Sequence, residues 1–211
     1  MKASNFPRTR AVALALALAS AATPALSQSR GDWTLGLGVH QVAPKSDNGS
    51  LAGGTLPVDV GSNIRPTITV EYFVRDNLGI ELLASLPFEH DISIDGLGQV
   101  GSTRHLPPTL SLQYHFNGAG KVSPFIGAGL NYTVFFSEET RGALSGSELD
   151  LDNSLGLAAH AGVDIRIGER GALRLDARWI DIDTEVELDG ASLGTVNIDP
   201  LVYGAAYVLR F

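Results

Sequence analysis

Apolar and polar residues alternate at every second position in eight separate segments of this sequence. In the first segment, Leu35, Leu37 and Val39 are interleaved with glycines and His40. A period of two is that of a β-strand, whose successive side chains point to opposite faces, whereas a helix repeats every ~3.6 residues. The segments cover residues 33–40, 67–72, 79–86, 109–116, 126–134, 155–166, 173–179 and 201–211. The sequence therefore predicts an all-β protein with eight strands.

The composition conflicts with that of an ordinary soluble domain. Charged residues make up 18% of the chain, where about 25% is usual, and the mean hydropathy is slightly positive. Yet no stretch reaches the roughly 20 apolar residues that a transmembrane helix requires. A membrane-spanning barrel resolves the conflict, because its lipid-facing residues occupy only every second position and no window becomes strongly apolar.

The connections between the predicted strands alternate strictly in length. Three are short, at residues 75–77, 117–121 and 168–171, and four are long, at residues 43–63, 89–104, 137–153 and 181–197. Soluble sandwiches and lipocalin-type barrels also alternate along each strand, but they have no reason for this asymmetry. In bacterial outer-membrane barrels the periplasmic turns are tight and the external loops are extended. We therefore expect an eight-stranded antiparallel up-and-down transmembrane β-barrel, with short turns and both termini periplasmic and long loops extracellular.

The polar face of the strands is expected to fill the lumen. An eight-stranded barrel is only wide enough for side chains, so inward charges would pair and seal the periplasmic half. Strand parity predicts a polar plug made of Glu71, Glu81, Asp164, Arg166, Arg174, Asp176, Arg178 and Arg210.

Aromatic residues on the outward face gather near the strand ends, as expected for girdles at the two membrane interfaces. The predicted girdle residues are Trp33, Tyr72, Tyr114, Tyr132, Trp179, Tyr203 and Tyr207, and Phe88 is expected beside the outer group. The chain ends in Phe211 after an alternating segment. A terminal aromatic there resembles the signal that the barrel-assembly machinery reads, and the last strand must pair with the first because lipid cannot satisfy an open edge.

Residues 1–27 have the order of a cleaved secretory signal peptide. Three basic residues precede an apolar run from Ala11 to Ala19, and the small residues Ala25 and Ser27 then offer a cleavage site. The run is too short for a membrane anchor. Removal takes the formal net charge from −8 to −11 and leaves residues 28–211 as the barrel domain.

Several classes of function are excluded or disfavoured. The lack of cysteine excludes disulfides, thiolate metal sites and cysteine nucleophiles. The acidic balance argues against nucleic-acid binding. The five histidines lack metal-site spacing, and the serines near the predicted rim form no triad pattern. The sequence predicts no cofactor, no bound metal and no enzymatic activity. The carboxylates alternating through residues 181–189 leave open a solvated hairpin or a divalent-cation bridge to lipopolysaccharide phosphates.

Several short sequence motifs match those of a known protein family, in the same order and at the same spacing. They are NLGIELLASLPFEH (77–90), HLPPTLSLQYHF (105–116), PFIGAGLNYTVFF (124–136), AGVD (161–164), DIDT (181–184) and DPLVYGAAYVLRF (199–211). The chain resembles the OmpW family of outer-membrane proteins, which includes AlkL-like members, through essentially all of residues 28–211. The resemblance implies a barrel in the Gram-negative outer membrane and passive uptake of small hydrophobic molecules, through a narrow channel with a lateral opening toward lipid.

A sealed periplasmic half leaves the outer half for an apolar pocket. Pro107 and Pro108 lack backbone donors, so they interrupt a strand ladder. This interruption is either a lateral exit or simply the end of a strand at the membrane surface, and the family resemblance favours the exit. The predicted solute path comprises Leu83, Pro87, Pro107, Pro108, Phe135 and Ile180.

The expected partners are outer-membrane lipid and lipopolysaccharide, the barrel-assembly machinery and small hydrophobic solutes. The alternative function is a structural or adhesive barrel, or a receptor, that conducts nothing. Uptake of an apolar solute by cells with and without the protein separates the two functions.

Overall fold

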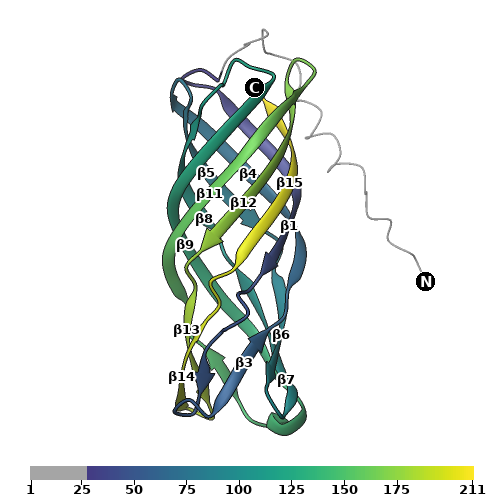
Figure 1. Ribbon diagram of the computed structural model, residues 1–211, viewed down its shortest axis with the longest axis vertical. Coiled ribbons are helices and arrows are strands. Elements are labelled where there is room, and N and C mark those ends of the chain that lie inside the picture. Colours follow the sequence, from purple (N-terminus) through teal and green to yellow (C-terminus); the bar gives the residue numbers. More distant parts are fainter. Residues whose placement is uncertain (1–27) are drawn as a thin grey trace, which may run out of the picture.

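Eight antiparallel strands form a closed barrel in the computed structural model, which describes residues 28–211 (Figure 1). The barrel strands are β1 (Trp33–Ala43), β4 (Asn63–Arg75), β5 (Leu78–Ser85), β8 (Thr109–His115), β9 (Val122–Thr140), β11 (Ser154–Ile167), β12 (Gly171–Ile180) and β15 (Leu201–Arg210). Pairing of β1 with β15 and of β9 with β11 closes the cylinder. The predicted fold class is confirmed. The predicted signal peptide, residues 1–27, lies outside the described residues.

Tight turns connect the barrel strands at one end, which we name the turn end. They follow β4, β8 and β11, and left-handed backbone at Asn77 (φ 63°) and Gly168 (φ 75°) reverses the chain in two of them. The chain ends here at Phe211, whose backbone exchanges hydrogen bonds of 3.0 Å with Trp33 (Figure 1). The first and last strands are thus paired to the end of the chain, as closure requires.

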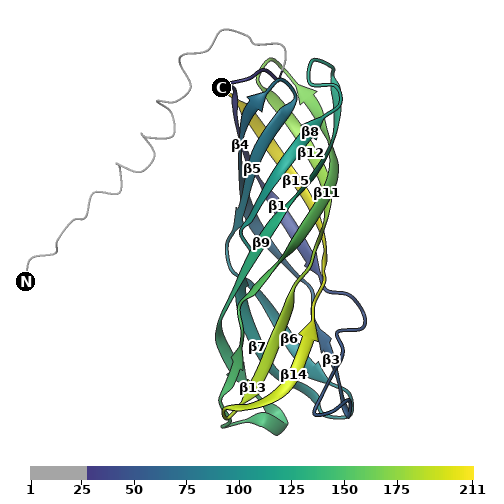
Figure 2. The same cartoon turned by 90° about the vertical axis from the view of Figure 1, so that its left-hand side faces the viewer.

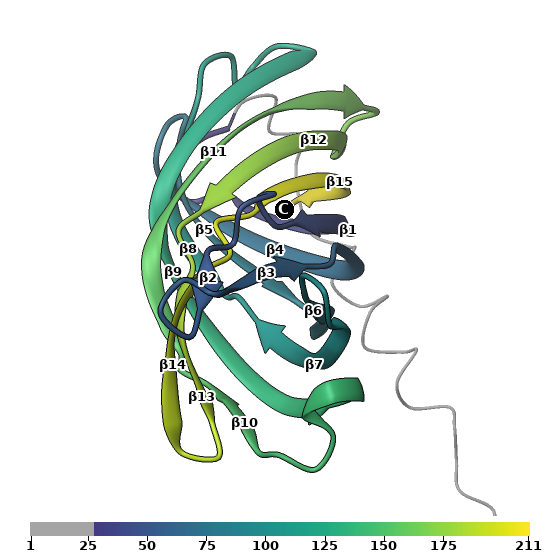
Figure 3. The ribbon, with the colours of Figure 1, turned by 60° about the horizontal axis from the view of Figure 1, so that its bottom comes forward.

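The long connections form β-structure at the opposite end, which we name the hairpin end. Figures 2 and 3 show these strands prolonging the cylinder beyond the barrel strands. They are β2 (Ser50–Leu51), β3 (Leu56–Val60), β6 (Phe88–Ile94), β7 (Gly98–Leu106), β10 (Leu149–Leu151), β13 (Asp183–Leu188) and β14 (Ala191–Asn197), with one short 3-10 turn, η2 (Gly142–Leu144). Connection length predicts loops here, and this is wrong because pairs such as Val58 and Val60 also alternate and supply a buried face.

The outward face of the barrel strands is apolar. Leu155 is 71% exposed, and Leu37, Leu110 and Leu130 are also exposed. Such exposure is unfavourable in water and appropriate against acyl chains. Within residues 28–211, no helix has the length and apolar character needed to cross a membrane.

The predicted girdle aromatics point outward. Trp33, Tyr114, Tyr132, Trp179, Tyr203 and Tyr207 are exposed, and Tyr72 is half-buried against Trp33 with ring centroids 4.8 Å apart. The prediction that Phe88 lies on the outward face is wrong: its side chain is only 2% exposed and points inward.

A change of register between β5 and β6 explains why the side chain of Phe88 points inward. Leu83 pairs with Thr109 and Phe88 with His105, so the four residues 84–87 lie opposite the three residues 106–108. The extra residue reverses the alternation, because side chains change face at each position along a strand. Even-numbered residues therefore point outward in β5 and inward at Phe88.

Candidate functional site: the barrel interior

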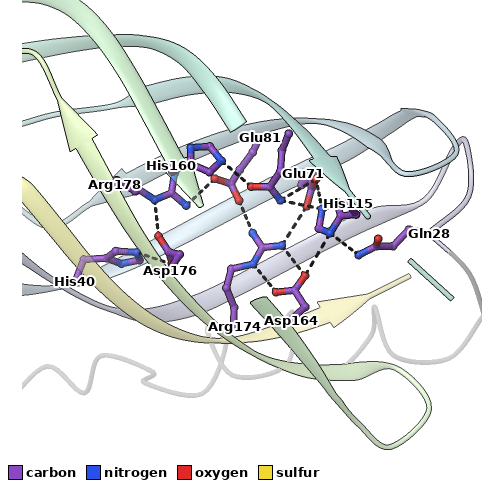
Figure 4. A network of polar contacts seen from close by, with 11 residues as sticks. Gln28, His40, Glu71, Glu81, His115, His160, Asp164, Arg174, Asp176 and Arg178 are labelled. Atoms are coloured by element: carbon purple, nitrogen blue, oxygen red, sulfur yellow. Dashed lines mark hydrogen bonds and ion pairs between the residues drawn. The ribbon is translucent and has the colours of Figure 1, made fainter. Parts of the chain in front are cut away.

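Arg174 is the centre of a polar network that fills the turn-end half of the barrel (Figure 4). It projects inward from β12 and is 1% exposed. Its Nε and Nη2 donate to the two oxygens of Asp164 at 2.8 and 2.9 Å, its Nη2 to Glu71 at 3.3 Å, and its Nη1 to Glu81. The guanidinium also lies over the ring of Phe125, 4.6 Å from its centroid. Arginine suits this position because its planar fork offers five donors.

Arg178 extends the network toward the hairpin end. Its Nη2 donates to Glu81 Oε1 at 2.8 Å and its Nε to Asp176 Oδ2 at 2.7 Å. The other oxygen of Asp176 lies 3.3 Å from His40 Nε2, and His40 Nδ1 lies 2.6 Å from Thr67 Oγ1. Glu81 therefore bridges the two guanidinium groups, so the plug is one continuous network (Figure 4).

Amide and imidazole side chains close the network toward the turn end. Glu71 Oε1 accepts from Gln113 Nε2 at 3.1 Å and from His115 Nε2 at 3.0 Å. His115 Nδ1 in turn lies 3.0 Å from Nε2 of Gln28, which is buried at the mouth of the barrel. His160 Nε2 lies 2.9 Å from Gln113 Oε1. Parity of β8 could have identified Gln113, but nothing in the sequence places Gln28 inside.

Six of the eight predicted plug residues meet in this network, namely Glu71, Glu81, Asp164, Arg174, Asp176 and Arg178. Arg166 and Arg210 lie instead at the turn-end mouth, where both line a polar cavity of about 30 Å³. Arg166 donates there to the carbonyl oxygens of Gly118 and Ala119 at 3.0 Å.

Glycine makes room for the plug. A Cβ at Gly79 would collide with the carboxylate of Glu71, and a Cβ at Gly204 would collide with the imidazole of His40. At these two positions the neighbouring strand therefore carries a large polar side chain that needs the space.

The interior turns apolar beyond the plug. Sixteen buried residues form one cluster there: Val42, Leu51, Val58, Val60, Phe88, Ile94, Val100, Phe135, Leu151, Ala158, Ile180, Ile182, Val186, Val196, Ile198 and Val202. Most of them come from the hairpin-end strands, which connection length predicts as loops, whereas Phe135 and Ile180 belong to the predicted solute path.

Two small cavities lie in this apolar region. The hairpin-end cavity, of about 40 Å³, is lined by leucine, isoleucine and valine side chains and by Thr103. The gap cavity, of about 10 Å³, lies against the plug and is lined by Leu83, Phe88, Pro107 and Ile180 among others. A water molecule needs roughly 10–15 Å³ by this measure, so a solute of several carbons enters only if the walls move.

The strand ladder is interrupted beside the gap cavity. Residues 84–87 and 106–108 lie between the last pair of β5 with β8 and the first pair of β6 with β7, and they form no ladder pairs with each other. We name this interruption the ladder gap. Pro87, Pro107 and Pro108 lie within it and have no backbone donor to offer. Asn131 Nδ2 binds both proline carbonyls of the second segment, at 3.0 and 3.2 Å.

The predicted path residues gather around the ladder gap. Leu83, Pro107 and Ile180 line the gap cavity, and Pro108 is half-buried beside them. The carbonyl of Pro87 accepts from Arg65 Nε at 2.8 Å. Phe135 packs one strand away, with its ring centroid 5.6 Å from that of His105. Whether a solute follows these residues stays a prediction.

A carboxylate cluster stands apart at the hairpin end. Oxygens of Asp181, Asp183 and Asp199 lie within 4.8 Å of one another. Lys45 Nζ lies 2.8 Å from Asp199 Oδ2, and this hydrogen bond raises the pKa of Lys45 above its ordinary value of 10.5. The lysine ammonium already balances one carboxylate of the group.

The family of this chain follows from comparison with known proteins. The model of the OmpW family matches residues 29–211. Outer membrane protein W of Vibrio cholerae is 34% identical over 210 residues, covering 94% of this chain and 97% of that protein. The dibenzothiophene metabolism operon protein PahQ of Pseudomonas aeruginosa is 28% identical over 217 residues, covering 96% and 99%.

Solved structures agree with the family match. The crystal structure of the outer-membrane protein OprG from Pseudomonas aeruginosa superposes with a TM-score of 0.78 at 30% identity, covering 88% of this chain and 98% of that chain. None of these three relatives carries the name of an enzyme. A closed eight-stranded barrel with a lipid-compatible exterior, matched along residues 29–211, therefore belongs to the OmpW family of outer-membrane proteins.

Proposed function

We propose that this protein carries small hydrophobic molecules passively across the outer leaflet of the outer membrane. The observation that supports it is the order of layers along the barrel axis: an apolar interior at the hairpin end, then the ladder gap, then a sealed polar plug. A solute entering at the hairpin end meets the plug and leaves sideways through the ladder gap into the bilayer. In this arrangement the hairpin end is extracellular, and the turn end with both termini is periplasmic.

Physical chemistry favours such a route. Lipopolysaccharide presents charged, ordered sugars that apolar solutes cross poorly, and burial of apolar surface gains roughly 25 cal/mol per Å². The hairpin-end strands carry an apolar interior past this layer. At the ladder gap no ladder pairs join the two facing segments of the wall. The relative PahQ is named for a dibenzothiophene metabolism operon, and dibenzothiophene is itself a small apolar compound.

The test is uptake of a medium-chain alkane by cells with and without the protein. Phe135→Asp should lower uptake to the level of cells lacking the protein, because it places a charge in the apolar interior. Phe135→Leu is the matched control and should retain most uptake, since it keeps the interior apolar. Normal uptake by a correctly assembled Phe135→Asp barrel contradicts the proposal.

The small cavities favour the alternative, a structural or adhesive barrel, or a receptor, without conduction. The gap cavity of about 10 Å³ admits no alkane as it stands. Equal alkane uptake by cells with and without the protein supports this alternative. Under either function the expected partners are lipid, lipopolysaccharide and the barrel-assembly machinery, which we propose recognises Phe211.

A further inference from the structure

Two histidines lie side by side in the apolar interior, just beyond the ladder gap. His90 on β6 and His105 on β7 are 1% and 0% exposed, and their ring centroids are 4.8 Å apart. In the strand ladder, His105 is paired with Phe88 of β6 on one side and with Phe135 of β9 on the other. The ring of Phe88 lies 6.4 Å from that of His90 and 5.7 Å from that of His105 between centroids, so His105 is enclosed mainly by the two phenyl rings.

Three of the four ring nitrogens have no hydrogen-bond partner among the described residues. His90 Nδ1 binds the carbonyl oxygen of Gly61, whereas His90 Nε2 and both nitrogens of His105 remain unpaired. Buried polar atoms are nearly always paired, because burial removes the hydrogen bonds that water would make. Two adjacent imidazoles with three unpaired nitrogens indicate a ligand that brings its own polar group.

The hydrogen bond to Gly61 fixes what His90 can offer. A carbonyl only accepts, so Nδ1 carries the proton and Nε2 is a bare acceptor in the neutral ring. Burial lowers the pKa of both histidines below the ordinary 6.5, and for His105 the neighbouring His90 lowers it further. Both rings are therefore neutral at neutral pH, and His105 has one donor and one acceptor.

The pair stands between the two apolar cavities. Phe88, opposite His105, lines the gap cavity, and Thr103, opposite His90, lines the hairpin-end cavity. Neither histidine lines a cavity itself, so a solute moving between the two cavities reaches these nitrogens only if the walls move.

We propose that His90 and His105 bind the hydroxyl group of an apolar alcohol or phenol on this path. The hydroxyl donates to His90 Nε2, and its oxygen accepts from the N–H of His105. An alkane makes neither bond, and an ether accepts but cannot donate. This assignment rests on the proposed function for the path and names a solute class within it: apolar molecules with a single hydroxyl.

A direct test uses the purified protein in lipid nanodiscs with octanol, octyl methyl ether and octane at equal concentrations in the membrane. Octanol should shift the imidazole nitrogen resonances of both histidines. The ether, which only accepts, should shift those of His105 alone, and octane should shift neither. Two hydrogen bonds correspond to roughly a tenfold preference for octanol over octane. Identical responses to all three probes overturn the assignment, and this arm needs no variant.

Variants separate hydrogen bonding from packing. His90→Leu removes the acceptor, so octanol and the ether should bind equally. His105→Gln keeps an N–H donor group and an acceptor atom and should retain most of the preference for octanol. Ile94→Val, on the same strand and lining the hairpin-end cavity, is the matched control that alters only packing. Loss of the preference in Ile94→Val alone contradicts a hydrogen-bonding role.

The two proposals fail in different ways. Protein-dependent octane uptake with no octanol preference in binding overturns the histidine site and leaves the proposed function standing. Octanol-dependent imidazole shifts without any protein-dependent uptake support the histidine site and overturn the transport function.

Discussion

At the residue scale, the plug depends on charge and shape together. One guanidinium contacts Asp164, Glu71 and Glu81 at once, and a second guanidinium shares Glu81. Carboxylates enclosed in this way have exchanged water for arginine donors. The loss of Arg174 leaves Asp164 and Glu71 buried without an arginine partner, and the loss of Arg178 does the same to Asp176. Stability is therefore concentrated in two side chains of β12.

Arg174→Leu is expected to destabilise the barrel by about 3–5 kcal/mol, because it strands buried carboxylates. Arg174→Lys should also destabilise it, since an ammonium cannot make the paired bonds to Asp164. The midpoint of urea unfolding in micelles measures both effects. Arg75→Leu, an exposed change at the turn end, is the control and should stay within about 0.5 kcal/mol. An Arg174→Lys barrel as stable as the parent contradicts this account.

At the element scale, the strands on the turn-end side of the ladder gap were predictable from the sequence, whereas side-chain orientations just beyond it were not. Alternation and connection lengths predicted the eight strands, and parity predicted most of the plug, because both follow from the period of two. Pro107 and Pro108 predicted the interruption itself. The inward turn of Phe88 was not predictable, because it depends on pairing four residues against three on another strand. The unpaired histidines likewise become visible only when burial and partners are known.

Closing the ladder gap should block lateral release. Ala84 and Pro108 would lie directly opposite if the register of β5 with β8 continued past Leu83 and Thr109. In this cysteine-free chain, oxidation of Ala84→Cys/Pro108→Cys should lower alkane uptake severalfold, and reductant should restore it. The control pair Ile80→Cys/Leu112→Cys joins positions already paired in the ladder and should leave uptake unchanged. Full uptake through the oxidised Ala84–Pro108 bridge contradicts lateral release at this place.

At the scale of the whole molecule, the two ends are stabilised differently. Ion pairs and hydrogen bonds fill the turn-end half, whereas apolar burial and two neutral imidazoles fill the hairpin end. The hairpin end should therefore respond to acid through His90 and His105.

Acid is expected to loosen β6 and β7. Burial lowers the pKa of His105 well below 6.5 and that of His90 below 6.5, so the opened form binds more protons than the closed form below that pH. The stability of the closed form is full above pH 6.5 and falls as the pH drops further. Amide hydrogen exchange, corrected for intrinsic rates, should lose protection in β6 and β7 near pH 5. His105→Phe should reduce the loss, and equal loss in that variant contradicts the mechanism.

The sealed plug has a consequence for the cell that carries this protein. A wide pore admits nutrients together with ions, detergents and antibiotics, and its synthesis weakens the sieving that the outer membrane provides. A barrel whose turn-end half is filled by such a plug leaves that sieve intact, since residues 28–211 leave no continuous aqueous column through it. We expect planar bilayers containing it to show no steady ionic current, so the cell can make many copies without leaking its periplasm.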